Sequence, residues 1–129
     1  MASEQAVDVS SLLMLRELQR PGAPDAVGRI VSRFLEEADE RLDVLDRAVA
    51  ERDAKLLEQA AHAMKGIAGT VGANEVREIA WRLEQLGRSG MTDGSIEGVD
   101  ELHGAFSRAR PTFEALREPA DATGGVASA

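Results

Sequence analysis

The segment LLEQAAHAMKGIAGTVG, residues 56–72, has the periodicity of an amphipathic helix and is the clearest guide to the architecture of the chain. At about 3.6 residues per turn, its apolar side chains fall on one stripe, made up of Leu57, Ala60, Met64, Ile67 and Val71. His62 lies on the opposite side of the same helix. A helix with one apolar side buries that side against other elements, so the stretch predicts a packed helical domain with His62 exposed to solvent.

The helix face around His62 is polar or lacks side chains. Lys65 follows at i+3, and Gly66 and Gly69 follow at i+4 and i+7. The other polar neighbours on this face are Lys55, Glu58 and Gln59. A glycine in a helix interior costs roughly 1 kcal/mol relative to alanine, so a function is expected to compensate for the pair. Helix packing explains Gly66 poorly because it points away from the apolar stripe, whereas Gly72 is better interpreted as a helix end.

The segment AHAMKG, residues 61–66, continues into a run of small residues up to Gly72. It resembles the phosphoacceptor helix of histidine-containing phosphotransfer (HPt) domains. The pattern of that family is a His, any residue, an apolar residue, Lys and Gly, followed by small residues that end in Gly. Met64 stands where Leu is usual and Ile67 where a small residue is common, but both side chains point into the apolar stripe. Only the residues around His62 are specific to the family.

The helical repeat recurs in four other parts of the chain, which cover about residues 10–20, 25–51, 74–87 and 95–117. Pro21 and Pro24 end the first of these segments, and Pro111 predicts a bend in the last. The expected helix N-caps are Ser10 or Ser11, Asp53 and Asn74. Trp81 lies off the centre of its apolar stripe, and we interpret it as a half-buried flank residue and not as a ligand-stacking group.

These segments predict an all-α fold, an antiparallel up-down four-helix bundle with a short N-terminal capping helix. One Trp, three Phe and no Tyr among abundant helix formers favour helices over strands. A chain of 129 residues can bury one core but not two. We assign residues 9–117 to the HPt-like bundle. Residues 1–8 are expected to be a flexible N-terminus and residues 118–129 a disordered tail, because both lack apolar periodicity.

The charge balance and the absence of cysteine exclude several classes of function. The net charge is −8 and the basic residues are interspersed with acids, which argues against binding to nucleic acid or to an anionic membrane surface. Without cysteine there is no disulfide framework and no thiolate metal site. No apolar run approaches the roughly 20 residues that span a bilayer, and the N-terminus lacks a signal-peptide pattern. We therefore expect a cytoplasmic protein without a membrane-inserted segment.

His62 has the chemistry of a phosphoryl acceptor. A neutral imidazole is a nucleophile near pH 7 because its ordinary pKa is about 6.5. Phosphoryl transfer also needs a nearby cation, which Lys65 can supply, and close approach of a partner, which Gly66 would permit. The resemblance to HPt domains implies that Nε2 of His62 is phosphorylated. It also implies that the donors and acceptors are aspartyl phosphates on receiver domains.

The expected partner is the receiver domain of a response regulator or of a hybrid sensor histidine kinase. The residues expected to contact it are Gly66, Gly69, Glu58, Gln59 and Lys55. We expect a monomeric phosphoryl carrier that is not an enzyme by itself, because the sequence offers no carboxylate cluster suited to Mg²⁺. No cofactor is expected on this chain, and Mg²⁺ is expected only on the receiver. Glu58 and His62 are spaced at i, i+4, but two ligands without a third do not predict a metal site.

Two other functions are compatible with the same helices. The chain could be a bundle that binds receiver or kinase domains without being phosphorylated, or a catalytic or metal-binding bundle, which has almost no support in the sequence. His103 lies at the edge of an apolar stripe without a lysine at i+3, so we interpret it as incidental. The sequence is compatible both with a free-standing protein and with the terminal domain of a larger hybrid kinase.

Overall fold

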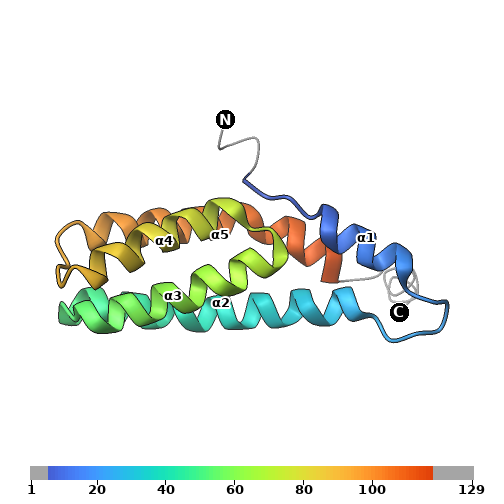
Figure 1. The fold of residues 1–129 in the computed structure, drawn as a ribbon, viewed down its shortest axis with the longest axis horizontal. Helices are drawn as coiled ribbons and strands as arrows, with labels where there is room; N and C mark the ends of the chain where they lie inside the picture. Colours follow the sequence, from blue (N-terminus) through green and yellow to red (C-terminus); the bar gives the residue numbers. More distant parts are fainter. Residues whose placement is uncertain (1–5, 118–129) are drawn as a thin grey trace, which may run out of the picture.

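The computed structural model describes residues 6–117, and all the regular structure within them is helical. The helices are α1 (Ser10–Leu18), α2 (Ala26–Glu51), α3 (Ala54–Val71), α4 (Asn74–Arg88) and α5 (Ser95–Arg117). Helices α2 to α5 form an antiparallel bundle, and the shorter α1 lies at one end of it against α2 (Figure 1). The predicted all-α bundle with a short N-terminal helix is therefore confirmed.

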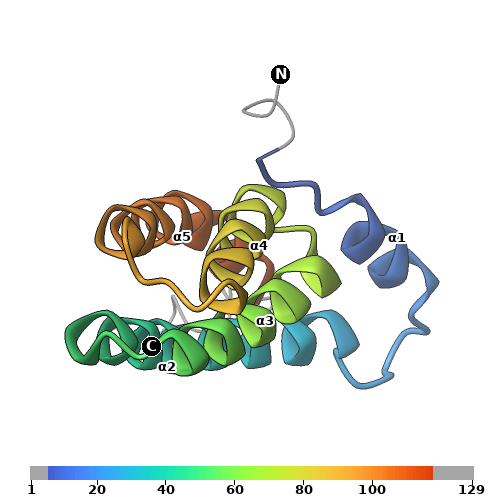
Figure 2. The ribbon, with the colours of Figure 1, turned by 60° about the vertical axis from the view of Figure 1, so that its left-hand side comes forward.

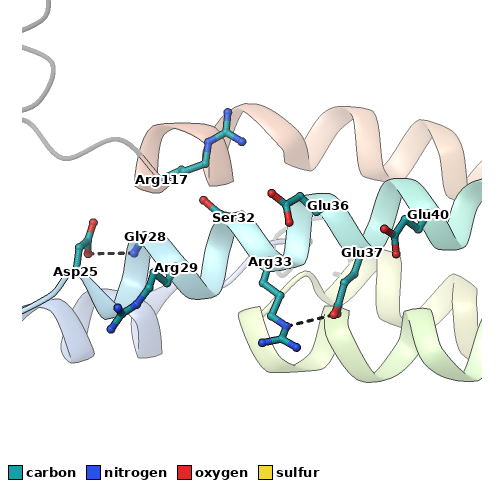
Figure 3. A pocket seen from close by; sticks show the side chains of 9 residues that line it. All are labelled: Asp25, Gly28, Arg29, Ser32, Arg33, Glu36, Glu37, Glu40 and Arg117. Carbon is teal, nitrogen blue, oxygen red and sulfur yellow. Dashed lines mark hydrogen bonds and ion pairs between the residues drawn. The ribbon is translucent and has the colours of Figure 1, made fainter.

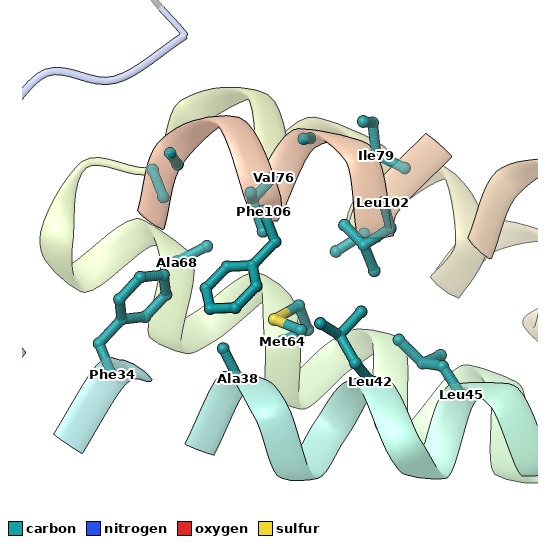
Figure 4. Close-up of a cluster of buried hydrophobic side chains, with 14 of the residues drawn as sticks. Phe34, Ala38, Leu42, Leu45, Met64, Ala68, Val76, Ile79, Leu102 and Phe106 are labelled. Carbon is teal, nitrogen blue, oxygen red and sulfur yellow. The ribbon is translucent and has the colours of Figure 1, made fainter. Parts of the chain in front are cut away.

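The four long helices pack in a closed ring, in which α3 contacts α2 and α4, and α5 contacts the same two helices from the other side (Figure 2). Their apolar stripes meet in one continuous core. Figure 4 shows Met64 of α3 among Ala38, Leu42 and Phe106. Phe34 packs edge to face against Phe106, with ring centroids 5.8 Å apart. Full burial of such a side chain contributes about 1.5–3 kcal/mol, so the stripes hold the helices in register.

The apolar stripe predicted for α3 is the side that faces the core. Leu57, Ala60, Met64 and Val71 are buried, and Ile67 is partly buried at the edge of the core. The spacing of the apolar residues along α3 sets which side of the helix faces the core, and the opposite side therefore lies in solvent.

Both ends of α3 are fixed by the residues that the sequence indicated. The side chain of Asp53 accepts a hydrogen bond from the Leu56 N–H at 3.0 Å, as expected of an N-cap. The helix ends at Gly72, where φ is +82°, a left-handed conformation that glycine adopts readily. A Cβ at Gly72 would also overlap the carbonyl oxygen of Asp8.

Two predicted N-caps were wrong. Helix α1 is capped by Val9 without a side-chain hydrogen bond, and the carboxylate of Asp8 instead accepts a hydrogen bond from the Ser10 N–H at 3.0 Å. Helix α4 begins at Asn74 itself, with Ala73 at the capping position. Ser10 and Asn74 are therefore the first residues of their helices. The Asp8 side chain takes the capping role at α1, and at α4 the carbonyl oxygens of Gly72 and Ala6 accept hydrogen bonds from the Asn74 and Glu75 N–H groups.

The segment before α1 is joined to the turn between α3 and α4. The Asp8 N–H donates to the Gly72 carbonyl oxygen at 2.9 Å, and the Glu75 N–H donates to that of Ala6 at 3.0 Å. The rest of the predicted flexible N-terminus, residues 1–5, and the predicted disordered tail, residues 118–129, lie outside the described residues. Helix α5 continues through Pro111, where a bend remains a prediction. In the part of the chain described, no helix is long and apolar enough to cross a membrane.

Candidate functional site

His62 lies near the middle of α3, and its side chain is 68% exposed. The residues beside it along the helix, Ala61 and Met64, are fully buried. The imidazole therefore stands on the outer surface while the other side of the same helix is held in the core. This agrees with the register predicted from the apolar stripe.

Glu84 of α4 is the central residue of the site, and sequence reasoning missed it. It lies across from His62 and is only 1% exposed. Its Oε2 atom is 2.8 Å from His62 Nδ1 and 3.0 Å from Arg88 Nη2. Its Oε1 atom is 2.7 Å from Lys65 Nζ. Within the described residues Oε1 has no well-directed hydrogen-bond donor, so its contact with Lys65 is an ion pair. One buried carboxylate thus joins three side chains of the exposed face.

The surroundings of Glu84 keep its carboxyl group ionised. Burial raises the pKa of Glu84, but the contacts and positive charges of Lys65 and His62 lower it more, and the resulting pKa lies below its usual value. An ionised carboxylate can only accept hydrogen bonds, so the proton lies on Nδ1 of His62. In the neutral imidazole the lone pair is then on Nε2, the nitrogen away from Glu84. The pairing selects the tautomer in which Nε2 is the nucleophile.

A hollow of about 390 Å³ adjoins His62 and brings together several predicted contact residues. It is lined by Lys55, Glu58, Gln59 and His62 of α3 and by Glu84 and Arg88 of α4. Arg88 bridges the two helices there, because its Nε atom is 3.2 Å from Glu58 Oε2 while its Nη2 atom contacts Glu84. Arg88 was also missed, and it holds the rim of this hollow in place.

The remaining predicted site residues lie further along α3. Lys65 is bound to Glu84 and is not a freely solvated lysine. A Cβ at Gly66 would meet nothing within 4 Å, so the main chain there is open to an approaching partner. A Cβ at Gly69 would come within 3.2 Å of Arg77 Cδ, because a side chain of α4 lies beside it. Gly66 therefore leaves bare main chain next to Lys65, and Gly69 accommodates Arg77.

Gly87 explains why Glu84 faces His62. Gly87 lies in the last turn of α4, which ends at Arg88 close to the end expected from the sequence, and it is buried. A Cβ at Gly87 would be 2.6 Å from the Glu58 nitrogen, so α3 and α4 approach closely at this point. The spacing of Ala80, Glu84 and Gly87 at i, i+4 and i+7 was the available signal, since it places the carboxylate between two small residues on one face.

Two other features of the surface lie apart from this site. A hollow of about 620 Å³ follows the outer face of α2, where Asp25 caps the helix and Arg33 pairs with Glu37 (Figure 3). None of the residues that line it belongs to α3 or α4. His103 of α5 pairs with Asp46 of α2, with Nε2 and Oδ1 2.9 Å apart. Within residues 6–117 no group of three or more His, Asp or Glu side chains could hold a metal ion.

Comparisons with known proteins agree with this geometry. The sequence model of a family described as "Hpt domain" matches residues 29–112. The crystal structure of histidine-containing phosphotransfer protein B (HptB) from Pseudomonas aeruginosa PAO1 is similar, with a TM-score of 0.77 and 25% identity over 87% of this chain and 94% of that one. The histidine-containing phosphotransfer protein ZmHP2 from maize gives a TM-score of 0.77 and 26% identity over 90% of each chain. A comparison with curated proteins gives no match.

Proposed function

The chain belongs to the Hpt domain family of histidine phosphotransfer proteins, and we propose that His62 carries the phosphoryl group on Nε2 between aspartates of receiver domains. The observation that carries the proposal is the pairing of Nδ1 with Glu84, which leaves an exposed imidazole with Nε2 as its free nitrogen. The same residue has an open main chain beside it at Gly66, where a receiver could approach.

The transfer step follows from this arrangement. The Nε2 lone pair attacks the phosphorus of an aspartyl phosphate, a P–N bond forms, and the P–O bond to the aspartate breaks, so the aspartate leaves as a carboxylate. Positive charge develops on the imidazole as the P–N bond forms, while the proton stays on Nδ1. The ionised Glu84, 2.8 Å away, stabilises that charge. Transfer to a second receiver is the same step in reverse.

We propose that Lys65 offsets charge on the phosphoryl oxygens. Its ammonium group lies against the same Glu84 carboxylate that pairs with His62, one helical turn along α3, and is therefore held on the same side of the helix as the imidazole. The chain supplies the nucleophile and this cation. The acidic residues and the Mg²⁺ that activate the phosphoryl group would belong to the receiver domain, so the protein acts as a carrier without catalytic machinery or a cofactor of its own. A cytoplasmic location and a monomeric state fit this role.

A phosphotransfer assay tests the proposal. A panel of receiver domains is phosphorylated with labelled acetyl phosphate and incubated with the protein in the presence of Mg²⁺. We expect label on the wild type and on His103→Gln, the matched control, and none on His62→Gln. Equal labelling of His62→Gln would refute the site. A receiver that binds the wild type without labelling it would instead indicate a non-phosphorylated adaptor.

A further inference from the structure

We propose that Arg77 and Trp81 of α4 extend the phosphoacceptor site into a docking surface that selects the receiver domain. The inference rests on the proposed function. It adds which side of His62 the partner covers and what chemistry the partner presents there, namely an apolar side chain against Trp81 next to a carboxylate on Arg77.

One face of α4 carries both the residues that contact the His62 cluster and the two residues proposed here. Arg77, Trp81, Glu84 and Arg88 recur at i, i+4, i+7 and i+11, so they form one stripe along the helix. Glu84 and Arg88 belong to the His62 cluster. Arg77 and Trp81 therefore continue the surface of that cluster toward the start of α4.

Trp81 is the exposed aromatic residue of this stripe. Its side chain is 48% exposed, and it lines a hollow of about 250 Å³ together with Lys65, Arg77 and Glu78. Lys65 connects the two regions, because it lines this hollow and also pairs with Glu84. A partner that reaches Nε2 of His62 thus meets the indole on the other side of Lys65.

Arg77 provides a positive charge that the described part of the fold leaves unpaired. Its aliphatic part lies against α3, where the missing side chain of Gly69 makes room for it. Within residues 6–117 its guanidinium group makes no ion pair, whereas Arg88 of the same stripe is paired with both Glu58 and Glu84. Arg77 is therefore available to a carboxylate on a partner.

A protein interface of ordinary size, centred on His62, would include Arg77 and Trp81. A stable interface covers about 800 Å² on each partner, whereas Trp81 and Glu84 are only about 4.5 Å apart along the axis of α4. Trp and Arg are also the residue types that most often dominate binding energy at interfaces. A receiver centred on His62 consequently covers Trp81, and the pair can distinguish one receiver from another.

Tryptophan fluorescence tests the contact directly, because Trp81 is the only tryptophan of the chain. The probe is the receiver domain that labels His62 fastest in the panel, with any tryptophan of its own replaced by phenylalanine. We expect its addition to shift the emission to shorter wavelengths and to reduce quenching by acrylamide. Unchanged emission and quenching at saturating receiver would overturn the proposal.

Substitutions measure how much the surface contributes. With the same receiver, Trp81→Ala and Arg77→Ala should each raise the KM of transfer about tenfold, with the rate at saturating receiver within about twofold of the wild type. Two controls should leave KM unchanged. Met91→Ala removes an exposed apolar side chain beyond the end of α4, and Arg82→Ala removes an α4 arginine whose contact is Glu101 of α5. A wild-type KM for both test variants would overturn the proposal.

A small donor separates docking from chemistry. Phosphoramidate can phosphorylate an exposed histidine without a protein interface, so Trp81→Ala and Arg77→Ala should take this label at the wild-type rate. Slower labelling would show that the two side chains position Lys65, which would also overturn the docking role. Failure of the proposed function would give a different result. The wild type would then take no label on His62, either from phosphoramidate or from any receiver. That result would overturn the docking proposal as well.

Discussion

The two histidines of this protein each pair with a carboxylate on a neighbouring helix, yet their surroundings differ. His62 Nδ1 is 2.8 Å from Glu84, which is 1% exposed, and His103 Nε2 is 2.9 Å from Asp46, whose side chain is 53% exposed. Water screens the exposed pair, so it contributes little, whereas the buried carboxylate acts at short range through a medium of low dielectric. The burial of the partner, and not the contact distance, distinguishes the His62 site from a surface ion pair.

The largest difference between the two pairs is expected when each carboxylate is replaced by its amide. Glu84→Gln keeps the shape and an acceptor for Nδ1 but removes the charge that stabilises the imidazole as the P–N bond forms. A hydrogen bond to a charged group contributes about 1.5–3 kcal/mol, so transfer should slow about 10- to 100-fold. The measurement is the rate of label transfer from a phosphorylated receiver. Asp46→Asn is the matched control and should transfer at the wild-type rate.

Equal rates in Glu84→Gln and Asp46→Asn would remove the distinction between the pairs. The buried carboxylate would then serve only to hold Lys65 and Arg88. Thermal unfolding of both variants is needed beside the rates, so that a slow Glu84→Gln is not simply an unfolded one.

Gly66→Leu separates the function of the His62 face from its stability. A leucine Cβ there meets no neighbouring atom, and glycine is less favourable than leucine in a helix by up to about 1 kcal/mol, so the variant should be slightly more stable. The side chain would nevertheless stand where a receiver approaches, and the KM for transfer should rise about tenfold. Gly104→Leu on α5 is the control and should leave KM unchanged. A wild-type KM for Gly66→Leu would show that the receiver does not come close to this main chain.

Acid unfolding should also distinguish the two carboxylates. The pKa of Glu84 is lowered in the folded protein by its contacts with Lys65 and His62. Its stabilising contribution is therefore present above the ordinary value of 4.5 and is lost as the pH falls from there toward the lowered pKa. We expect the stability difference between the wild type and Glu84→Gln to shrink in that range. Asp46→Asn should change the free energy of unfolding by no more than about 1 kcal/mol at any pH.

A stability difference between the wild type and Glu84→Gln that stays constant from neutral pH to well below 4.5 would contradict the lowered pKa. Denaturant unfolding at several pH values makes this measurement. It is independent of phosphotransfer, so it tests the electrostatics of the site even if no receiver is at hand.

The features that could be predicted from the sequence depend on residues close together in the chain, and those that could not depend on contacts between distant residues. The exposure of His62 and the helices of the bundle depend on a local period, which can be read from the chain. The pairing with Glu84 joins residues that are 22 apart and depends on how α3 and α4 pack. Gly87 controls that packing by allowing a close approach to the main chain of Glu58. The sequence shows Gly87 only as a glycine near the end of its helix, so its role in this close approach could not be recognised from the local pattern.

The predicted N-caps also depend on contacts between residues that are distant in the sequence. Asp53 was identified correctly because, among the residues that the structure describes, no other group accepts the hydrogen bond of the Leu56 N–H. Asn74 was not, because the main chain of Ala6 accepts the hydrogen bond of the Glu75 N–H. That contact comes from a segment far away in the sequence, so no local pattern around Asn74 announces it.

The smallest expected effect is that of His62→Ala on stability. The imidazole is largely exposed, and without it Glu84 keeps its hydrogen bond from Arg88 and its ion pair with Lys65. The buried charge is then still compensated, so the free energy of unfolding should stay within about 0.5 kcal/mol of the wild type. Denaturant unfolding measures it, and His103→Ala should behave alike. A loss of several kcal/mol would mean that Glu84 needs the imidazole as its counter-charge, and that the nucleophile and the fold cannot be varied independently.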